Sequence, residues 1–166
     1  MKKRIVLVRH ANAEEPGFYG KDFDRKLIEK GLSESELMGD WLAGSSYLPE
    51  FIATSKAPRA AQTADIINKS LNLVSISYHQ KLYDGGPLAY LNIVNQMDEK
   101  YATAMVVGHN PDISYFVDYL CGQNVGSMKK AGIAVIEFDD LAWNEISRGV
   151  GSLKLYTTPK MVRSEK

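Results

Sequence analysis

Four short runs of apolar residues alternate along the chain with longer stretches of helical spacing. The runs are Ile5–Val8, Phe51–Ala53, Ala104–Val107 and Ile133–Ile136. Runs this continuous are typical of strands that are buried on both faces. Between two of the runs, Ile113–Leu120 has apolar residues three and four positions apart, as in an amphipathic helix. The alternation predicts an α/β fold, a three-layer α/β/α sandwich around a mostly parallel central sheet with right-handed crossovers.

The C-terminal part of the chain departs from this alternation. Only a polar loop separates the apolar run Ile133–Phe138 from the alternating segment Leu153–Tyr156. Two neighbouring strands without a helix between them predict an antiparallel pair at the edge of the sheet. Residues 160–166 are mostly charged, and we expect them to be frayed. Residues 1–159 are expected to form a single domain, because no repeat, linker or low-complexity segment divides them.

Composition and charge narrow the classes of function. The 20 Lys and Arg residues balance the 20 Asp and Glu residues, so no overall field favours nucleic acid or an anionic membrane surface. Any phosphate binding must therefore come from a local cluster of cations. The single cysteine, Cys121, cannot form an internal disulfide, and the apolar run before Arg9 is too short for a signal segment or membrane span. We expect a cytoplasmic protein that binds neither nucleic acid nor membrane.

Two of the three histidines stand close after predicted strands. His10 follows the run Ile5–Val8, and His109 follows Ala104–Val107. The carboxyl ends of strands in an open α/β sheet are where ligands bind. One histidine at a strand end is equally compatible with a structural imidazole, but two at equivalent points favour a shared site. His79 follows none of the predicted strands, and we expect it on the surface.

Two arginines add positive charge to the same region. Arg9 precedes His10, and Arg59 follows Pro58, a residue suited to the first position of a helix. A cation in the first turn is disfavoured by the helix dipole unless an anion is bound there. Together with a protonated His109, the two arginines predict a phosphoryl pocket. The alternative is an ordinary helix start with a solvated arginine.

A second helix start is predicted after His109. Asn110 has the residue type of a helix cap, and Pro111 suits the first position of the helix. The amide groups at this helix start would point at the same place as those that follow Pro58. The two helix starts would therefore strengthen the binding of a phosphoryl group.

These residue types indicate phosphoryl transfer without a metal. A neutral His10 is a strong nucleophile, and its attack on phosphorus would form a covalent phosphohistidine that water later hydrolyses. Side-chain cations can stabilise the negative charge on the transferred group. The sequence has neither an H-E-x-x-H pattern nor a cluster of closely spaced histidines or cysteines, so we expect no metal site and no cofactor.

Three segments resemble, in order, the motifs of the histidine phosphatase superfamily, which includes the phosphoglycerate mutases. They are Leu7–Ala11, Ser55–Ala64 and Val107–Pro111. The segment Asp22–Arg25, the pair Leu82–Tyr83 and the short chain resemble more narrowly the small phosphohistidine phosphatases of the SixA type. Ala11 stands where the superfamily commonly has glycine after the nucleophile, a difference that is common in this subgroup.

The resemblance implies a phosphoglycerate mutase-like fold and roles for individual residues. It makes His10 the nucleophile and implies no metal. The phosphate-binding and catalytic set that it implies is Arg9, His10, Arg59 and His109. Ser55, Asn110 and Arg25 are further candidates for the pocket, although an exposed salt bridge is an equal alternative for Arg25.

The resemblance and the local signals disagree about the start of the first helix. Ser33 and Glu36 form a capping box, which predicts a start at Ser33. The family pattern starts this helix near Ile28 and Glu29. We adopt the family boundary and leave Ser33 as an interior signal.

The general acid is the open point of the mechanism. Larger relatives use a glutamate shortly after a leucine, and SixA-type phosphatases generally lack it. Asp84, two positions after Leu82, is a candidate for this role, and the alternative is a turn residue before Gly85 and Gly86. Phosphoesters have poor alkoxide leaving groups that profit from an acid, whereas phosphoimidazole leaves more easily. A missing acid would therefore fit an N-phosphorylated substrate.

Taken together, the residues and the resemblance predict a metal-independent phosphatase with a covalent phosphohistidine intermediate. The expected substrate and partner is a protein phosphorylated on histidine. About eighteen residues separate Asp84 from Thr103, too few for a long insertion that would close over a small metabolite. The alternatives are a phosphatase for small phosphate esters and a catalytically silent phosphate-binding module.

Overall fold

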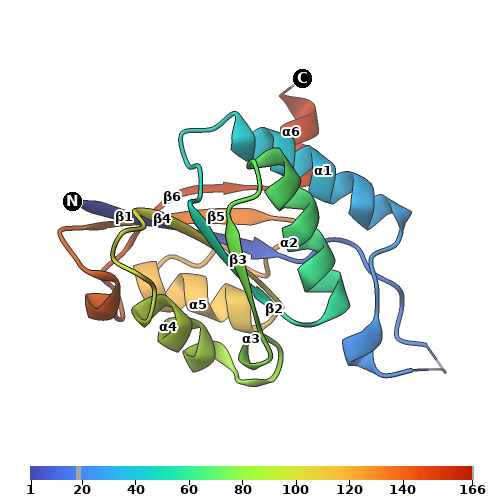
Figure 1. Cartoon of the computed structure of the whole chain (residues 1–166), viewed down its shortest axis with the longest axis horizontal. Coiled ribbons are helices and arrows are strands. Elements are labelled where there is room, and N and C mark those ends of the chain that lie inside the picture. The colour runs from blue at the N-terminus through green and yellow to red at the C-terminus, as the bar shows by residue number, and fades with distance from the viewer. Residues whose placement is uncertain (18–19, 166) are drawn as a thin grey trace.

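The structure, a computed structural model, describes residues 1–17 and 20–165. Its centre is a sheet of six strands in the order β3-β2-β4-β1-β5-β6 (Figure 1). The strands are β1 (Lys2–Arg9), β2 (Phe51–Ser55), β3 (Ser75–His79), β4 (Thr103–Gly108), β5 (Ile133–Asp139) and β6 (Ser152–Thr157). The neighbouring pairs among β1 to β4 are parallel, and β5 runs antiparallel to both β1 and β6. The expected antiparallel pair is thus β5 and β6.

Helices cover both faces of this sheet. They are α1 (Glu29–Ala43), α2 (Pro58–Ser70), α3 (Lys81–Asp84), α4 (Pro87–Asn95), α5 (Asp112–Cys121) and α6 (Pro159–Ser164), with short 3₁₀ helices η1 (Asp22–Asp24) and η2 (Trp143–Glu145). Helices α1, α2 and α6 lie on one face, and α3, α4 and α5 lie on the other (Figure 1). This arrangement confirms the predicted three-layer α/β/α sandwich.

The burial of β1 explains why its apolar run is continuous. Ile5 and Leu7 pack in the hydrophobic cluster of α4 and α5, whereas Val6 and Val8 pack in the cluster of α1 and α2. All four side chains are fully buried. A strand whose alternate side chains enter two separate cores needs apolar residues at every position.

The sheet topology gathers several strand ends at one edge. Arg9, the last residue of β1, pairs with Gly108, the last residue of β4, and β2 lies on the other side of β4. On the opposite flank, Val8 pairs with Ile133 of β5, which pairs with Thr157 at the end of β6. The loops that follow β1, β2, β4 and β6 therefore meet at this end of the sheet. We call it the catalytic edge because the candidate catalytic residues His10, Arg59 and His109 follow strands that end here.

The first helix begins at Glu29, so the boundary taken from the family pattern is confirmed and the capping box at Ser33 is not used. The reason is a tertiary contact. The Ile28 amide donates to the Asn12 carbonyl (3.1 Å), and a Cβ at Gly31 would overlap that same carbonyl oxygen. Packing against the loop after β1 thus fixes the helix start, and a local capping signal inside the helix cannot move it.

The prediction of a frayed C-terminus is wrong through Ser164. Residues 159–164 form α6, and Val162 is only 3% exposed within the core beneath α1 and α2. The Thr158 hydroxyl caps this helix by accepting from the Met161 amide (3.2 Å), and Pro159 occupies its first turn. Lys166 lies outside the described residues.

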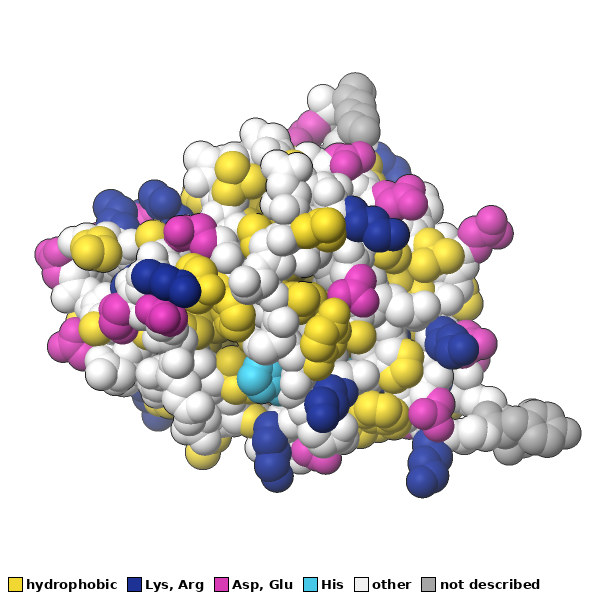
Figure 2. All heavy atoms as spheres, in the orientation of Figure 1, with side chains coloured by type: hydrophobic (Ala, Val, Ile, Leu, Met, Phe, Trp, Pro, Cys, Tyr) yellow, Lys and Arg dark blue, Asp and Glu magenta, His cyan; other side chains and the backbone are white. Residues whose placement is uncertain are grey.

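His79 is the last residue of the edge strand β3, so the expectation that it follows no strand is wrong. It is half-buried, and its Nε2 lies 2.7 Å from the Ser77 hydroxyl. Figure 2 shows Lys and Arg side chains interspersed with Asp and Glu on one face, as the zero net charge leads one to expect. None of the helices in residues 1–17 and 20–165 is long and apolar enough to cross a membrane.

Candidate active site

The two strand-end histidines and Arg59 come together at the catalytic edge. His10 follows β1, His109 follows β4, and Arg59 lies in the first turn of α2 after Pro58, as predicted. The rings of His10 and His109 are 5.2 Å apart between centroids. The exposed fractions are 5% for His10, 5% for Arg59 and 7% for His109. The structure thus buries three polar side chains side by side at the end of the sheet.

His10 is held as a neutral ring with one free nitrogen. Its Nδ1 lies 2.8 Å from the carbonyl oxygen of Ala11, which makes Nδ1 the donor and leaves the lone pair of Nε2 unshared. Burial, followed by the nearby charges of Arg59 and Arg9, lowers the pKa of His10 to about 4. The Ala11 amide in turn donates to the Thr63 hydroxyl (3.1 Å), which ties the loop after β1 to α2.

His109 is also neutral, which corrects the expectation of a protonated ring in the free protein. Burial lowers its pKa to about 3, and the positive charges around it act in the same direction. Its Nε2 lies 2.8 Å from the Ser55 hydroxyl, which already accepts from the Ala57 amide and can donate to this nitrogen. The proton of His109 then sits on Nδ1, a buried atom with no hydrogen-bond partner among the described residues.

The two arginines each keep one buried donor unused. The Nε atoms of Arg9 and Arg59 are buried and have no hydrogen-bond partner in the described part of the chain. Arg9 donates through Nη1 to the Met128 carbonyl (2.7 Å), and Arg59 donates through Nη1 to the Asp22 carbonyl (2.8 Å). Buried donors are normally satisfied, so unused donors on two guanidinium groups whose charges both act on His10 indicate an anion-binding position.

Asp22 and Tyr83 are members of the site that the sequence analysis did not propose. The Asp22 carboxylate accepts from Arg59 Nη2 (3.0 Å), Arg25 Nη1 (2.9 Å) and the Tyr83 hydroxyl (2.8 Å). These hydrogen bonds, that of Arg25 first, lower the pKa of Asp22 to about 2. The Tyr83 ring meets the His109 ring edge to face at 5.4 Å between centroids. Arg25, a candidate for the pocket, therefore reaches it through Asp22.

The backbone of His109 is anchored by a buried tyrosine. The Tyr90 hydroxyl accepts from the His109 amide (3.0 Å) and donates to the Leu82 carbonyl (3.2 Å). A Cβ at Gly108 would overlap the Tyr90 hydroxyl, so this close approach requires glycine. Tyr90 thus couples the end of β4 to α3, the helix that carries Tyr83.

Asn110 has a different role from the predicted one. Helix α5 begins at Asp112, and the Asn110 side chain caps no backbone amide. Instead its Nδ2 donates to the Ser127 hydroxyl (2.7 Å) and the Met128 carbonyl (3.1 Å), while its Oδ1 accepts from the Ser114 hydroxyl (2.5 Å). Because the Met128 carbonyl also binds Arg9, Asn110 supports the loop that orients this arginine.

Among the described residues, the Asp84 side chain forms no hydrogen bond or ion pair with the other candidates. It is exposed at the end of α3, and its Oδ2 accepts from Gln80 Nε2 (3.2 Å). Its neighbour Tyr83 is the α3 residue that faces His109. Within residues 1–17 and 20–165, no group of three or more His, Cys, Asp or Glu side chains could hold a metal ion.

Comparison with known proteins identifies the family. The histidine phosphatase superfamily (branch 1) matches residues 5–86, which include His10 and Arg59. The chain belongs to this superfamily. Phosphohistidine phosphatase SixA of Escherichia coli is 28% identical over 143 residues, which cover 82% of this chain and 86% of that protein.

Solved structures of SixA proteins are similar to this histidine phosphatase over almost the whole chain. A protein assigned as the phosphohistidine phosphatase SixA from Agrobacterium tumefaciens superposes with a TM-score of 0.82 at 27% identity and covers 95% of this chain and 98% of that one. The protein histidine phosphatase SixA complexed with tungstate gives a TM-score of 0.78 at 26% identity, over 95% of this chain and 97% of that one. These similarities confirm the predicted family and fold, and they support phosphatase activity.

Proposed function

We propose that this protein is a metal-independent phosphohistidine phosphatase in which His10 forms the covalent intermediate. The observation that carries the proposal is the constellation of a buried neutral His10 with a free Nε2 beside unused donors on Arg9, Arg59 and His109. A nucleophile next to unsatisfied donors matches what in-line transfer of a phosphoryl group requires.

The reaction proceeds in two steps on this constellation. In the first, the lone pair of His10 Nε2 attacks phosphorus, and the bond to the substrate nitrogen breaks. Arg9, Arg59 and the Nδ1–H group of His109 stabilise the charge on the equatorial oxygens. In the second, a water oxygen attacks phosphohistidine, releases inorganic phosphate and restores neutral His10.

The substrate class follows from the proton donors at the site. Asp22 is the carboxyl group in contact with Arg59, and its pKa of about 2 leaves it without a proton at neutral pH. Asp84 bonds to Gln80 on the exposed end of α3. An alkoxide would leave without help from either residue, whereas an imidazole protonated on its second nitrogen leaves as a neutral group. This favours phosphohistidine over phosphate esters, and the similarity to SixA supports the same substrate.

The deciding experiment measures turnover side by side on a phosphohistidine protein, a phosphoaspartyl protein and simple phosphate esters. We expect the highest kcat/KM on phosphohistidine and an acid-labile phosphoryl label on His10 when the reaction is quenched. Faster turnover of an ester would favour the small-molecule phosphatase. Phosphate binding without turnover on any substrate would favour the silent binding module.

Metal independence is tested separately. Because side-chain donors take the place of a metal ion in this mechanism, an excess of chelator is expected to leave kcat unchanged within error. A loss of activity that one divalent ion restores would contradict the mechanism. The cytoplasmic location also stays a prediction, which fractionation of cells that express the protein would test.

A further inference from the structure

A cavity with an excess of positive charge adjoins the catalytic edge. It has a volume of about 980 Å³ and lies among the end of β1, the start of α1 and helix α6. Six basic side chains line it: Arg9, Lys30, Lys129, Lys130, Lys160 and Arg163. Glu34 is the single acidic residue of its lining within the described chain. We call this the basic cavity.

The charge of the basic cavity is not neutralised from within. None of its six cations forms an ion pair with the residues that the structure describes. Glu34 is 5% exposed, and its Oε1 already accepts from the Asn12 side chain (2.6 Å) and the Asn12 amide (3.3 Å). In a protein of zero net charge, this local excess of positive charge attracts an acidic partner.

The cavity is joined to the nucleophile through the backbone. The Ala131 amide donates to the carbonyls of both Arg9 (3.0 Å) and His10 (3.1 Å), so Lys129 and Lys130 directly precede a residue bonded to the nucleophile segment. The Lys129 amide donates to the Tyr156 hydroxyl (2.8 Å), which holds this loop against β6. Arg9 lines the cavity and also lowers the pKa of His10. When the phosphohistidine of a protein substrate is held at His10, the substrate residues around it would therefore lie over the basic cavity.

We infer that the basic cavity docks acidic side chains of the protein that carries the phosphohistidine. This inference rests on the proposed function. Lys30, Lys160 and Arg163 are exposed cations on α1 and α6, and they form no compact buried cradle of the kind that a small anion needs. Charges spread over an open rim instead suit an acidic protein surface, where they raise the rate and selectivity of encounter. Tyr156 and Met161 add apolar contact area for such a surface.

The test uses two synthetic phosphohistidine peptides, one with Asp and Glu flanking the phosphorylated residue and one with Ser and Gln. Phosphoramidate serves as a substrate too small to reach the cavity. The double variant Lys160→Glu, Arg163→Glu removes cations of the cavity. The matched control, Lys69→Glu with Arg148→Glu, makes the same charge change at exposed residues outside the cavity lining.

We expect the wild type to prefer the acidic peptide by about tenfold in kcat/KM at low salt, and the preference to fall as salt is added. The cavity variant loses this preference but keeps its rate on the neutral peptide and on phosphoramidate, while the control variant behaves like the wild type. Equal kcat/KM on the two peptides, or an equal loss in both variants, would overturn the inference.

Binding keeps the inference testable if the proposed function fails. The unphosphorylated acidic peptide, followed by fluorescence anisotropy, is expected to bind the wild type and the control variant more tightly than the cavity variant. Absence of turnover with this binding difference intact would reject the phosphatase proposal and keep the docking site. Tighter binding of a single-stranded oligonucleotide than of the acidic peptide would reject an acidic protein as the occupant.

Discussion

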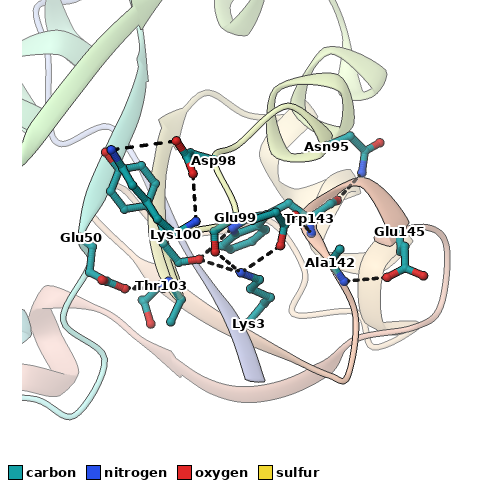
Figure 3. Close-up of polar contacts among 12 residues, drawn as sticks. Lys3, Glu50, Asn95, Asp98, Glu99, Lys100, Thr103, Ala142, Trp143 and Glu145 are labelled. Atoms are coloured by element: carbon teal, nitrogen blue, oxygen red, sulfur yellow. Dashed lines mark hydrogen bonds and ion pairs between the residues drawn. The ribbon is translucent and has the colours of Figure 1, made fainter. Parts of the chain in front are cut away.

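Strand β1 carries a buried cation near its start and another cation at its end. The two cations differ in whether their hydrogen-bond donors have partners. Near the start, Lys3 is 1% exposed. Its Nζ donates to the carbonyls of Glu99 and Tyr101, both at 2.9 Å, and pairs with the Glu99 carboxylate at 3.2 Å (Figure 3). The same ammonium group lies 5.2 Å from the centre of the Trp143 ring. At the end of β1, Arg9 keeps a buried Nε without a partner in the described chain.

The difference separates a structural polar group from a functional one. Around Lys3 the network is closed, since Trp143 donates through its amide to Glu99 Oε1 (2.7 Å) and through Nε1 to the Tyr101 carbonyl (2.9 Å), as Figure 3 shows. At the catalytic edge, Arg59 and His109 keep unused buried donors as Arg9 does. Satisfied buried groups add stability, whereas unsatisfied ones lower stability and persist where they bind a ligand. Substitutions at the two ends of β1 should therefore separate stability from activity.

The largest effect is expected from His10→Ala. Loss of the nucleophile should lower kcat on a phosphohistidine peptide by about 10³-fold or more. Tungstate or phosphate binding, measured by calorimetry, should persist because Arg9, Arg59 and His109 still supply their donors. A variant that keeps substantial turnover would refute covalent catalysis by His10, and one that no longer binds tungstate would make His10 part of the anion site as well.

The pair Arg59→Met and Lys3→Met tests the comparison directly. Removal of Arg59 should lower kcat/KM by about 10²-fold or more, the usual scale for a transition-state donor. The free energy of unfolding of Arg59→Met should differ from the wild type by less than about 1 kcal/mol, because Asp22, its ion-pair partner, is half exposed and the Arg59 Nε has no partner in the described chain.

Lys3→Met should have the opposite profile. It leaves the carbonyls of Glu99 and Tyr101 without their donor, which should lower the free energy of unfolding by about 2 kcal/mol. Activity per folded molecule should stay at the wild-type level. Urea unfolding gives the stability of each of the two variants, and kcat/KM gives its activity. Parallel losses of stability and activity in the two variants would break the proposed separation between the two ends.

Much of this organisation follows from local sequence signals. Continuous apolar runs mark doubly buried strands, and the positions of His10 and His109 close after two of them mark the catalytic edge. Pro58 predicts the start of a helix, and Arg59 is a cation in its first turn, where the helix dipole disfavours one. The structure confirms this helix start. Each of these signals lies within a few neighbouring residues, so periodicity and helix-start preferences suffice to interpret them.

Other features depend on contacts between distant segments, and local patterns do not contain them. Asp22 and Tyr83 are 61 positions apart and meet only because η1 and α3 flank the same edge. The start of α1 depends on the Asn12 carbonyl, not on the capping box at Ser33. Helix α6 does have a local signal, Thr158 followed by proline, whereas the expectation of a frayed tail rested on its charged residues alone.

The pH dependence of stability should arise at the catalytic edge. His10 has a pKa of about 4 in the folded protein, below the ordinary 6.5 of the unfolded chain. The unfolded state therefore takes up the proton first, and stability present above pH 6.5 is lost as the pH falls toward about 4. The expected loss is about 2 kcal/mol for His10 over this range.

Urea unfolding at pH 7.5, 6 and 5 measures this loss, and His10→Ala should reduce it. An identical pH profile in the variant would place the sensitivity elsewhere. Turnover should also persist below pH 6.5, because His10 stays neutral until its pKa of about 4 is approached. An activity that falls with an apparent pKa near that of an exposed histidine would contradict the neutral nucleophile.

The smallest effect is expected from Asp84→Asn. Asp84 is exposed and bonds to Gln80, and an imidazole leaving group needs little protonation, so kcat should stay within about twofold of the wild type on phosphohistidine. General acid catalysis is typically worth about 10² to 10⁴ in rate, so a selective loss of that size on a phosphate ester with a basic leaving group would make Asp84 the acid. Asp22→Asn is the matched comparison, because this carboxylate does contact Arg59, and it should change KM more than Asp84→Asn does. A large and equal loss on both substrates in Asp84→Asn, with folding intact by circular dichroism, would instead assign Asp84 to the positioning of α3 and Tyr83.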